Sequence, residues 1–331
     1  MKYDVYGIGN ALVDMEYMVN DSFLTDHSIE KGLMTLVEEE RQDQLVKALS
    51  KNCEVKRQCG GSAANSIIAV SQFGGNSFYS FKVASDEAGK FYLADMRENG
   101  VDTKNVEGNL PEGTTGKCMV MVTNDAERTM NTFLGITASL SPEQIDEAAL
   151  KNSKWLYVEG YLVASPTGQQ AAVEAIKLAK SNNVKTSFTM SDPNMVKFFK
   201  NNIDAIIGKD GLDLIFCNEQ EALEFTGAND LADAREELKK SANTFVITLG
   251  KNGAIIWDGT MFIDIEPHRV EAIDSNGAGD MYAGAFLYGI TNGMNYAGAG
   301  ALASLASSKV VEQYGPRINW TIAKDILNAH E

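Results

Sequence analysis

The segment most suggestive of chemistry is Asp274–Asp280, which reads Asp-Ser-Asn-Gly-Ala-Gly-Asp and is followed by a run of small and apolar residues. Glycines at the start of a helix leave backbone N–H groups uncovered, and the helix dipole attracts an anion to them. Asp280, in the first turn, would lie beside this anion hole. Its carboxylate could take a proton from an attacking hydroxyl while the N–H groups hold developing phosphate charge. The segment also fits a glycine-rich turn in which Asp274 caps the helix.

Asp280 would be a weak base if it were exposed, because an exposed aspartate has a pKa of roughly 4. It would then act only as the acidity of the hydroxyl rises during phosphoryl transfer.

Two segments near the beginning of the chain could bind a sugar-like substrate. Gly60–Asn65, Gly-Gly-Ser-Ala-Ala-Asn, opens a predicted helix, and Asn65 offers both a donor and an acceptor to a hydroxyl. Gly9–Asp14 follows the first predicted strand, where Asp14 could accept hydrogen bonds from two vicinal hydroxyls. Leu12 occupies the place of the third glycine in a dinucleotide-binding fingerprint, which argues against a dehydrogenase.

Two later segments could contact a nucleotide. Asn218 and Glu221 follow a strand, and they could order water around Mg²⁺, which prefers oxygen ligands and keeps several waters. The same residues also fit a helix that begins with acidic side chains. The turn Thr248–Gly253 could carry nucleotide phosphates. The chain has no Gly-x-x-x-x-Gly-Lys-Ser/Thr sequence and no protein-kinase signature, which excludes those two phosphoryl-transfer classes.

The elements that would position these residues alternate between strand and helix. Short apolar strands are predicted at 3–8, 78–83, 155–158, 186–189, 212–216 and 245–248, with helices such as 63–73, 86–99, 167–181 and 231–240 between them. This alternation predicts a three-layer α/β sandwich, with a central, mostly parallel sheet flanked by helices. Such sheets bind ligands beyond the carboxyl ends of their strands, where the motifs above fall.

Two segments do not fit a parallel sheet. Lys117–Thr123 and Arg128–Phe133 flank the turn residues Asn124 and Asp125, which is typical of a β-hairpin, and Gly32–Val37 reads as a short strand. We predict that inserted segments at about 11–37 and 112–135 form a small β lid.

Composition limits the class of protein. The formal net charge of −16 disfavours nucleic acid and anionic membrane as partners. Four cysteines without a Cys-x-x-Cys pair, and a beginning without a signal-peptide pattern, indicate reduced thiols and a cytoplasmic location. Residues 281–308 carry no charge, but their many small residues and a break at 291–295 predict two buried helices and no membrane span.

Together these motifs resemble the ribokinase-like, or PfkB, family of carbohydrate and nucleoside kinases, over essentially the whole chain, 1–331. Gly60-Gly61-x-x-x-Asn65 resembles the amino-terminal signature of the family, and Asp274–Asp280 its carboxyl-terminal one. Ser275 stands where threonine is commoner and keeps the hydroxyl. The chain is most similar to bacterial adenosine kinase-like members, through residues 9–14, 61–62, 127–131 and 159–162.

The resemblance implies a role for each matching residue. Asp280 would be the base. The anion hole would be formed by Gly277, Ala278 and Gly279. The acceptor substrate would be bound by Asn10, Asp14, Gly61, Ser62, Asn65, Cys118, Tyr161 and Leu162. ATP would be bound by Asn218, Thr248, Gly250, Gly253, Asn276 and Arg128. Mg²⁺ would be held through water by Glu221 and Asn218, and K⁺ would lie near the anion hole, with the loop Gln313–Arg317 as a candidate contributor.

Some of these residues have equally good structural explanations. Arg128 also fits a surface arginine, and Cys118, Tyr161 and Leu162 also fit core packing.

The function expected from the resemblance is transfer of the γ-phosphoryl group of ATP to the 5′-hydroxyl of a nucleoside, adenosine above others. A sugar kinase for ribose, fructose or a related sugar is the nearest alternative. A non-catalytic nucleoside or nucleotide sensor is an alternative from another class. In each case the partner is a small molecule, and the protein would be a monomer or a homodimer.

Overall fold

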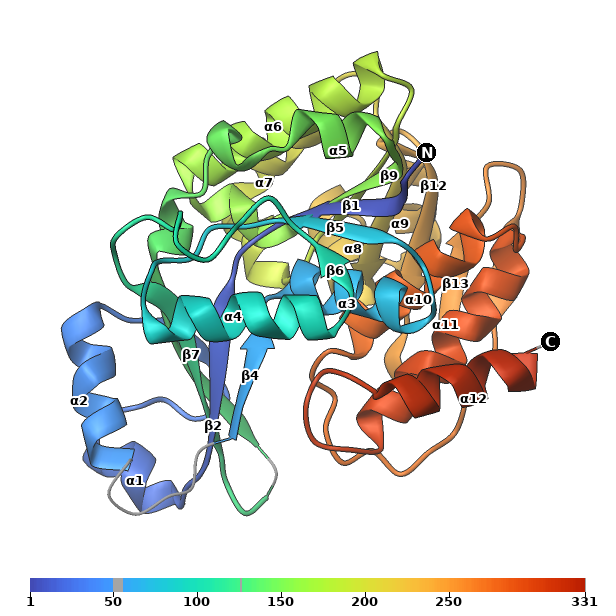
Figure 1. Cartoon of the computed structure of the whole chain (residues 1–331). Coiled ribbons are helices and arrows are strands. Elements are labelled where there is room, and N and C mark those ends of the chain that lie inside the picture. Colours follow the sequence, from blue (N-terminus) through green and yellow to red (C-terminus); the bar gives the residue numbers. More distant parts are fainter. Residues whose placement is uncertain (50–55, 126, 331) are drawn as a thin grey trace.

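The chain folds into three layers with a smaller sheet at one side (Figure 1). The computed structural model describes residues 1–49, 56–125 and 127–330. The predicted α/β class is confirmed: a large sheet lies between two layers of helices. Cys59, Cys118 and Cys217 are buried free thiols, while Cys53 lies outside the described residues.

The large sheet has nine strands. Their order across the sheet is β14 (Phe262–Ile265), β13 (Ala254–Trp257), β12 (Ala242–Thr248), β11 (Leu212–Asn218), β10 (Lys185–Thr189), β9 (Ser153–Val158), β1 (Tyr3–Ile8), β5 (Ser77–Ser80) and β6 (Val101–Asp102). Neighbours from β6 through β12 are parallel, and only the pairs β12–β13 and β13–β14 are antiparallel, so β13 alone runs against the other strands. The sheet is therefore mostly parallel, as predicted.

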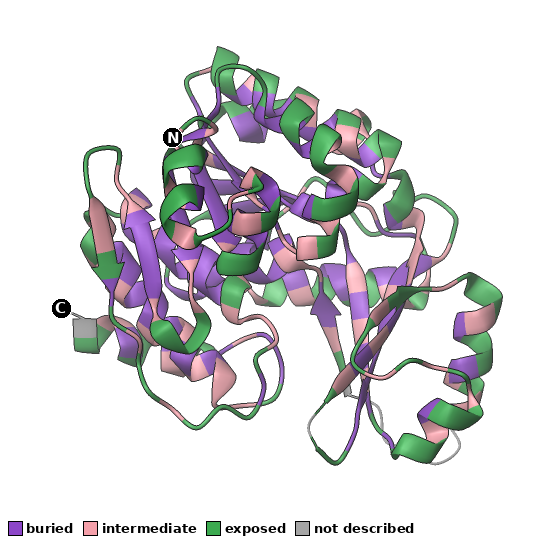
Figure 2. Cartoon of the chain, turned by 180° about the vertical axis from the view of Figure 1, so that it is seen from behind, coloured by how far each residue is buried: buried purple, intermediate pink, exposed green. Residues whose placement is uncertain are grey.

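Both faces of the large sheet are buried. Successive side chains of a strand point to opposite faces, so each strand supplies residues to both apolar clusters. In β1, Val5 joins one apolar cluster while Tyr6 and Ile8 join the other. In β9, Tyr157 and Leu156 divide in the same way. Figure 2 shows the strands as a buried band between helices that are exposed on their outer sides.

Each cluster is closed by its own layer of helices. One layer contains α5 (Glu147–Lys151), α6 (Pro166–Ser181), α7 (Pro193–Ile207), α8 (Glu219–Thr226) and α9 (Leu231–Leu238). The other contains α3 (Ser62–Gln72), α4 (Glu87–Glu98), α10 (Ala278–Thr291), α11 (Tyr296–Val311) and α12 (Trp320–His330). Short 3₁₀ turns lie at η1 (Ile136–Ser139), η2 (Pro142–Gln144), η3 (Gly160–Ala164) and η4 (Gly250–Asn252).

The uncharged stretch after Asp280 forms α10 and α11, so the predicted pair of buried helices is confirmed. In the described part of the chain, no helix has the length and apolarity needed to cross a membrane. Small residues let these helices approach closely. An added Cβ at Gly284 would lie 2.4 Å from the Ser66 carbonyl oxygen of α3, and one at Gly289 would lie 2.8 Å from the Ala299 Cβ of α11.

The smaller sheet has five strands, in the order β3 (Met34–Leu36), β8 (Arg128–Gly135), β7 (Thr115–Val122), β2 (Leu12–Met18) and β4 (Lys56–Gly60). The predicted hairpin is β7–β8 and the predicted short strand is β3. β2 and β4 were not predicted as strands, and β4 lies outside the bounds expected for the lid. Helices α1 (Asp21–Asp26) and α2 (Glu39–Leu49) flank this sheet (Figure 1).

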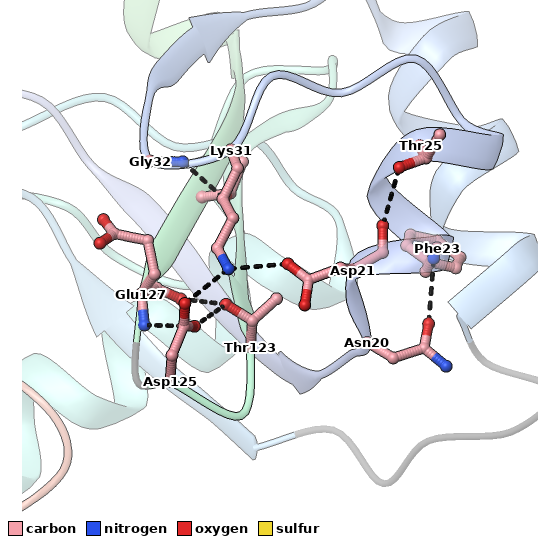
Figure 3. A network of polar contacts seen from close by, with 10 residues as sticks. Asn20, Asp21, Phe23, Thr25, Lys31, Gly32, Thr123, Asp125 and Glu127 are labelled. Atoms are coloured by element: carbon pink, nitrogen blue, oxygen red, sulfur yellow. Dashed lines mark hydrogen bonds and ion pairs between the residues drawn. The ribbon is translucent and has the colours of Figure 1, made fainter.

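A polar network ties the far end of the smaller sheet together (Figure 3). The Lys31 ammonium lies 2.7 Å from carboxylate oxygens of both Asp21 and Asp125, and so connects the segment after α1 with the β7–β8 turn. The Gly32 N–H donates to the Thr129 hydroxyl at 3.0 Å. These contacts join the segment 20–37 to the hairpin, so we expect the two to move as one body.

The close contact between α10 and α3 gives a stability prediction. Gly284→Ala should lower the free energy of unfolding by about 1–3 kcal/mol, because its Cβ would push against a backbone carbonyl that can move only with α3. Gly298→Ala, in α11, is the matched control. Its Cβ would meet nothing closer than 3.4 Å, so it should be neutral or slightly stabilising. Urea denaturation measures both, and equal stabilities would contradict the prediction.

Candidate active site

A cavity of about 340 Å³ lies between the large sheet and the smaller one. Its lining draws on distant parts of the chain, since Asn10, Asp14 and Asn65 face the same space as Asn276 and Asp280. Most of the residues expected to bind the acceptor or to catalyse its phosphorylation line it: Asn10, Asp14, Gly61, Ser62, Asn65, Cys118, Tyr161, Gly277, Gly279 and Asp280. Asn276, which was expected to bind ATP, lines it as well. The two sequence signatures therefore form one site.

Asp280 is held in place by the first turn of α3. The Ser62 hydroxyl donates to its Oδ1 at 2.6 Å, and the Asn65 side-chain amide donates to its Oδ2 at 3.0 Å. Burial raises the pKa of Asp280 to about 6, although these two hydrogen bonds and the positive charge of Arg317 act to lower it. The expected exposed carboxylate with a pKa near 4 is thus wrong, and Asp280 is a stronger base than the sequence suggested.

The backbone beside Asp280 is shaped by its glycines. Gly277 is the residue before α10 and adopts a left-handed conformation with φ 75°. An added Cβ there would lie 2.3 Å from the Pro316 Cβ, so a side chain is excluded both by conformation and by space. An added Cβ at Gly279 would meet nothing within 4 Å, which leaves the first turn of α10 open toward the cavity. An anion can approach the helix start here.

The glycine pair before α3 makes room for groups from other strands. The Asp14 carboxylate packs where a Cβ on Gly60 would be, 2.2–2.4 Å from that position. A Cβ on Gly61 would lie 2.5 Å from the carbonyl oxygen of Asn10. Burial raises the pKa of Asp14 to about 7, while Arg317 and Arg128 act to lower it. Asp14 therefore enters the cavity as a poorly solvated carboxyl group.

A third carboxylate, Glu159, was not expected to act at the site. It is buried, follows β9 and accepts from the Asn10 backbone N–H at 3.2 Å, the Asn10 amide at 2.7 Å and the Ala63 N–H at 2.9 Å. Burial raises its pKa to about 7, against the effect of these hydrogen bonds. Glu159 thus fixes Asn10 and the start of α3. Its place directly after a parallel strand was the signal that could have identified it.

The opposite side of the cavity is apolar and belongs mainly to the smaller sheet. Its side chains come from alternate positions of β2, β3, β7 and β8, which face the same way: Leu12, Met34, Leu36, Val120, Met130 and Leu134. We call these six residues the apolar wall. From this side of the cavity, only Cys118 was predicted to contact a ligand. β3, β7 and β8 were predicted as strands, but the direction in which their side chains face depends on pairing that the sequence does not show.

Several predicted residues lie elsewhere. Leu162 is buried in the core on the α6 side of the sheet, so its assignment to a base pocket is wrong. Thr248, Gly250 and Gly253 are not part of the cavity lining. Gly253 has a structural reason to be glycine, because an added Cβ would lie 2.0 Å from the Ile265 carbonyl oxygen of β14.

Asn218 and Glu221 form a capping box at the start of α8. Asn218 accepts from the Glu221 N–H at 2.8 Å, and Glu221 accepts from the Asn218 N–H at 2.9 Å and from its amide at 2.9 Å. Glu221 is buried, and burial raises its pKa to about 7. The described residues contain no group of three acidic, histidine or cysteine side chains that could hold a metal directly. Contact with Mg²⁺ through water stays a prediction.

Arg128 lies on β8 but points to acidic side chains. Its guanidinium forms an ion pair with Asp274, which also accepts from the Gly315 N–H at 2.9 Å, and a longer one of 3.4 Å with Glu16. Arg128 lines a small second cavity, which shares Asp14, Val120 and Asn276 with the first. In this state Arg128 joins the smaller sheet to the segment before α10, and its predicted contact with a nucleotide stays a prediction.

Comparison with known proteins decides the family. The profile of pfkB family carbohydrate kinases matches residues 32–323. The chain belongs to this family. A probable sugar kinase from Rhizobium etli is 32% identical, with a TM-score of 0.90 over 99% of this chain and 98% of that one. The adenosine kinase of Sinorhizobium meliloti is 34% identical, with a TM-score of 0.89 over 99% of this chain and 100% of that one.

A relative from Clostridium beijerinckii, a 5-dehydro-2-deoxygluconokinase, is 27% identical over 82% of this chain and 85% of its own length. As a member of the pfkB family, the protein is an enzyme, a kinase that phosphorylates a hydroxyl group. Its relatives include kinases for sugars and for adenosine.

The buried acidic residues predict an unusual dependence of stability on pH. The pKa of Asp14 is higher in the folded protein, about 7, than in the unfolded chain, so its burial disfavours folding increasingly as the pH rises from about 4 to 7. Asp14→Asn should therefore raise the melting temperature by about 2 °C or more at pH 8 and show a smaller gain at pH 5. Asp43→Asn, which removes an exposed carboxylate from α2, is the control. A gain that does not shrink on acidification would contradict the prediction.

Proposed function

We propose that the chain is an ATP-dependent kinase that transfers the γ-phosphoryl group to the 5′-hydroxyl of a nucleoside, and that adenosine is the acceptor. The observation that carries this proposal is the division of the cavity into two parts. Its polar end holds Asp14, Asn65 and Asp280, and its other side is the apolar wall. A nucleoside has the matching division between a hydroxylated ribose and a flat, largely apolar base.

The polar end suits the ribose and the chemistry. Asp14 can accept hydrogen bonds from vicinal hydroxyls, and Asn65 keeps one amide N–H for a ligand after donating the other to Asp280. With the ribose in this orientation, its primary hydroxyl would point to Asp280 and the start of α10.

The reaction then needs little from the protein besides position and charge. The 5′-oxygen attacks the γ-phosphorus in line with the departing ADP, and Asp280 accepts the hydroxyl proton as the new O–P bond forms. The open N–H groups of the first turn of α10 stabilise the negative charge on the transferring group. Mg²⁺ bound with the nucleotide would neutralise phosphate charge.

A sugar kinase is the second candidate, and it is favoured by the relatives that phosphorylate 5-dehydro-2-deoxygluconate or are named as sugar kinases. A free sugar would use the polar end alone and would leave the apolar wall without a ligand. Rates with adenosine, inosine, guanosine, ribose and fructose on the purified protein distinguish the candidates. Calorimetric binding of adenosine without any ATP turnover would instead support the sensor.

The base is tested by Asp280→Asn. The variant should keep ATP binding, measured by calorimetry, and lose about three orders of magnitude in kcat, because the amide cannot accept the proton. In the wild type, kcat should fall with acidification below about pH 6, as Asp280 becomes protonated. Turnover by the variant within tenfold of the wild type would refute the role of Asp280.

The apolar wall is tested by Met130→Gln, a change of polarity at similar size. It should raise KM for adenosine roughly tenfold, since part of the apolar contact with the base is lost, and leave kcat nearly unchanged. Rates with ribose should not change. Met18→Gln, at an exposed methionine on the same sheet outside the cavity, is the control. An unchanged KM for adenosine in Met130→Gln would argue against a nucleoside.

A further inference from the structure

Arg317 lies outside the two sequence signatures, yet it contacts the residue that orients Asp280. It is in the loop between α11 and α12, and its side chain is only 10% exposed. Its Nε–H donates to the Asn65 Oδ1 at 2.9 Å. The Asn65 amide, in turn, donates to Asp280 at 3.0 Å. The Arg317 guanidinium is therefore connected to the proposed base through one intervening side chain, that of Asn65.

We propose that Arg317 is a positioning residue for phosphoryl transfer: it fixes the direction of the Asn65 amide and supplies a buried positive charge to the acidic cluster around Asp280. This proposal rests on the function proposed above, in which Asp280 is the base.

The chemistry of the three groups permits only one direction for the amide. A guanidinium can donate but cannot accept hydrogen bonds, so the oxygen of Asn65 must face Arg317. Its NH₂ group is then left to face Asp280. Without Arg317 the amide could rotate and bring its oxygen against the carboxylate. That arrangement repels the ionised form of Asp280, which is the form that can accept a proton.

The guanidinium is itself fixed by two other partners. One terminal nitrogen lies 2.7 Å from an Asp95 carboxylate oxygen of α4, and the other donates to the Cys59 carbonyl of β4. Three groups from three elements thus accept hydrogen bonds from the planar guanidinium. The single ammonium group of a lysine could not donate in all three directions at once. This is the arrangement expected of a group whose orientation matters.

The neighbours of Arg317 in the loop contact the same site. The Gly315 N–H donates to Asp274, and Pro316 packs against Gly277 at the start of α10. Three consecutive residues of this loop therefore contact three parts of the site: Asp274, Gly277 and the Asn65 amide. We call residues 315–317 the supporting loop.

Several titratable groups face Asp280 from the surrounding elements. They are Asp14 from β2, Tyr79 from β5, Tyr157 from β9, Glu159 and Tyr161 from the segment after β9, and Arg317 from the supporting loop. Burial raises the pKa of each of these tyrosines, so they stay neutral. Asp14 and Glu159 repel the ionised Asp280, and Arg317 opposes them by lowering the pKa values of both Asp14 and Asp280.

The test measures kcat/KM for the acceptor against pH at saturating ATP, using the acceptor on which the wild type is most active. In Arg317→Met, the acid limb should move to higher pH by about half a unit or more, because a positive charge near the carboxylates is lost. Its kcat at the optimum should fall at least about tenfold, because the Asn65 amide is no longer fixed. Arg317→Lys should keep the wild-type acid limb and still lose kcat.

Lys309→Met is the matched control, since it removes one positive charge from a half-exposed ion pair with Glu312 in the same part of the chain. It should match the wild type in both measurements. If Arg317→Met shows the acid limb of the control, the proposal is overturned. If Arg317→Met does not fold, Arg317→Lys decides, because wild-type kcat in that variant would overturn the proposal. A wild type that phosphorylates no acceptor would instead refute the proposed function.

Discussion

The contact between α10 and α3 is the constraint on which the site depends. α10 brings Asp280 and the open backbone turn, and α3 brings the two side chains that hold its carboxylate. The helices can meet closely only because Gly284 leaves space for the backbone of α3. The same small residues that bury the helices thus determine how far Asp280 lies from Ser62 and Asn65.

The site collects negative charge in a place where water is scarce. Asp14, Glu159 and Asp280 all have raised pKa values, and burial is the first cause in each case. Arginines offset part of this destabilisation. A folded protein that was selected for stability alone would replace such carboxylates by amides. In the proposed reaction, this cost in stability gives Asp280 a pKa nearer to neutral pH than that of an ordinary aspartate.

Much of this could be predicted from the sequence, because the features were local. The apolar strands fixed the class of fold, and the glycine-rich signatures identified residues such as Gly277, Asn65 and Asp280 that face one cavity. What was missed depends on pairing between distant segments. β2 and β4 become strands only through each other and β7, and their mixed polar composition gives no clear pattern. Leu162 was misassigned because sequence position near Tyr161 does not determine which way a side chain points.

The cavity joins residues near position 10 to residues near position 280, which the supporting loop 315–317 contacts, and this order has a consequence for synthesis of the chain. While the polypeptide emerges from the ribosome, β1, β5 and α3 are available long before α10 and the loop after α11 exist. Until α10 has been synthesised, the apolar face of α3 that α10 covers in the folded protein lacks this partner helix. Such long-range closure is slow and leaves intermediates open to aggregation, so chaperone demand and yield should depend strongly on the carboxyl-terminal segment.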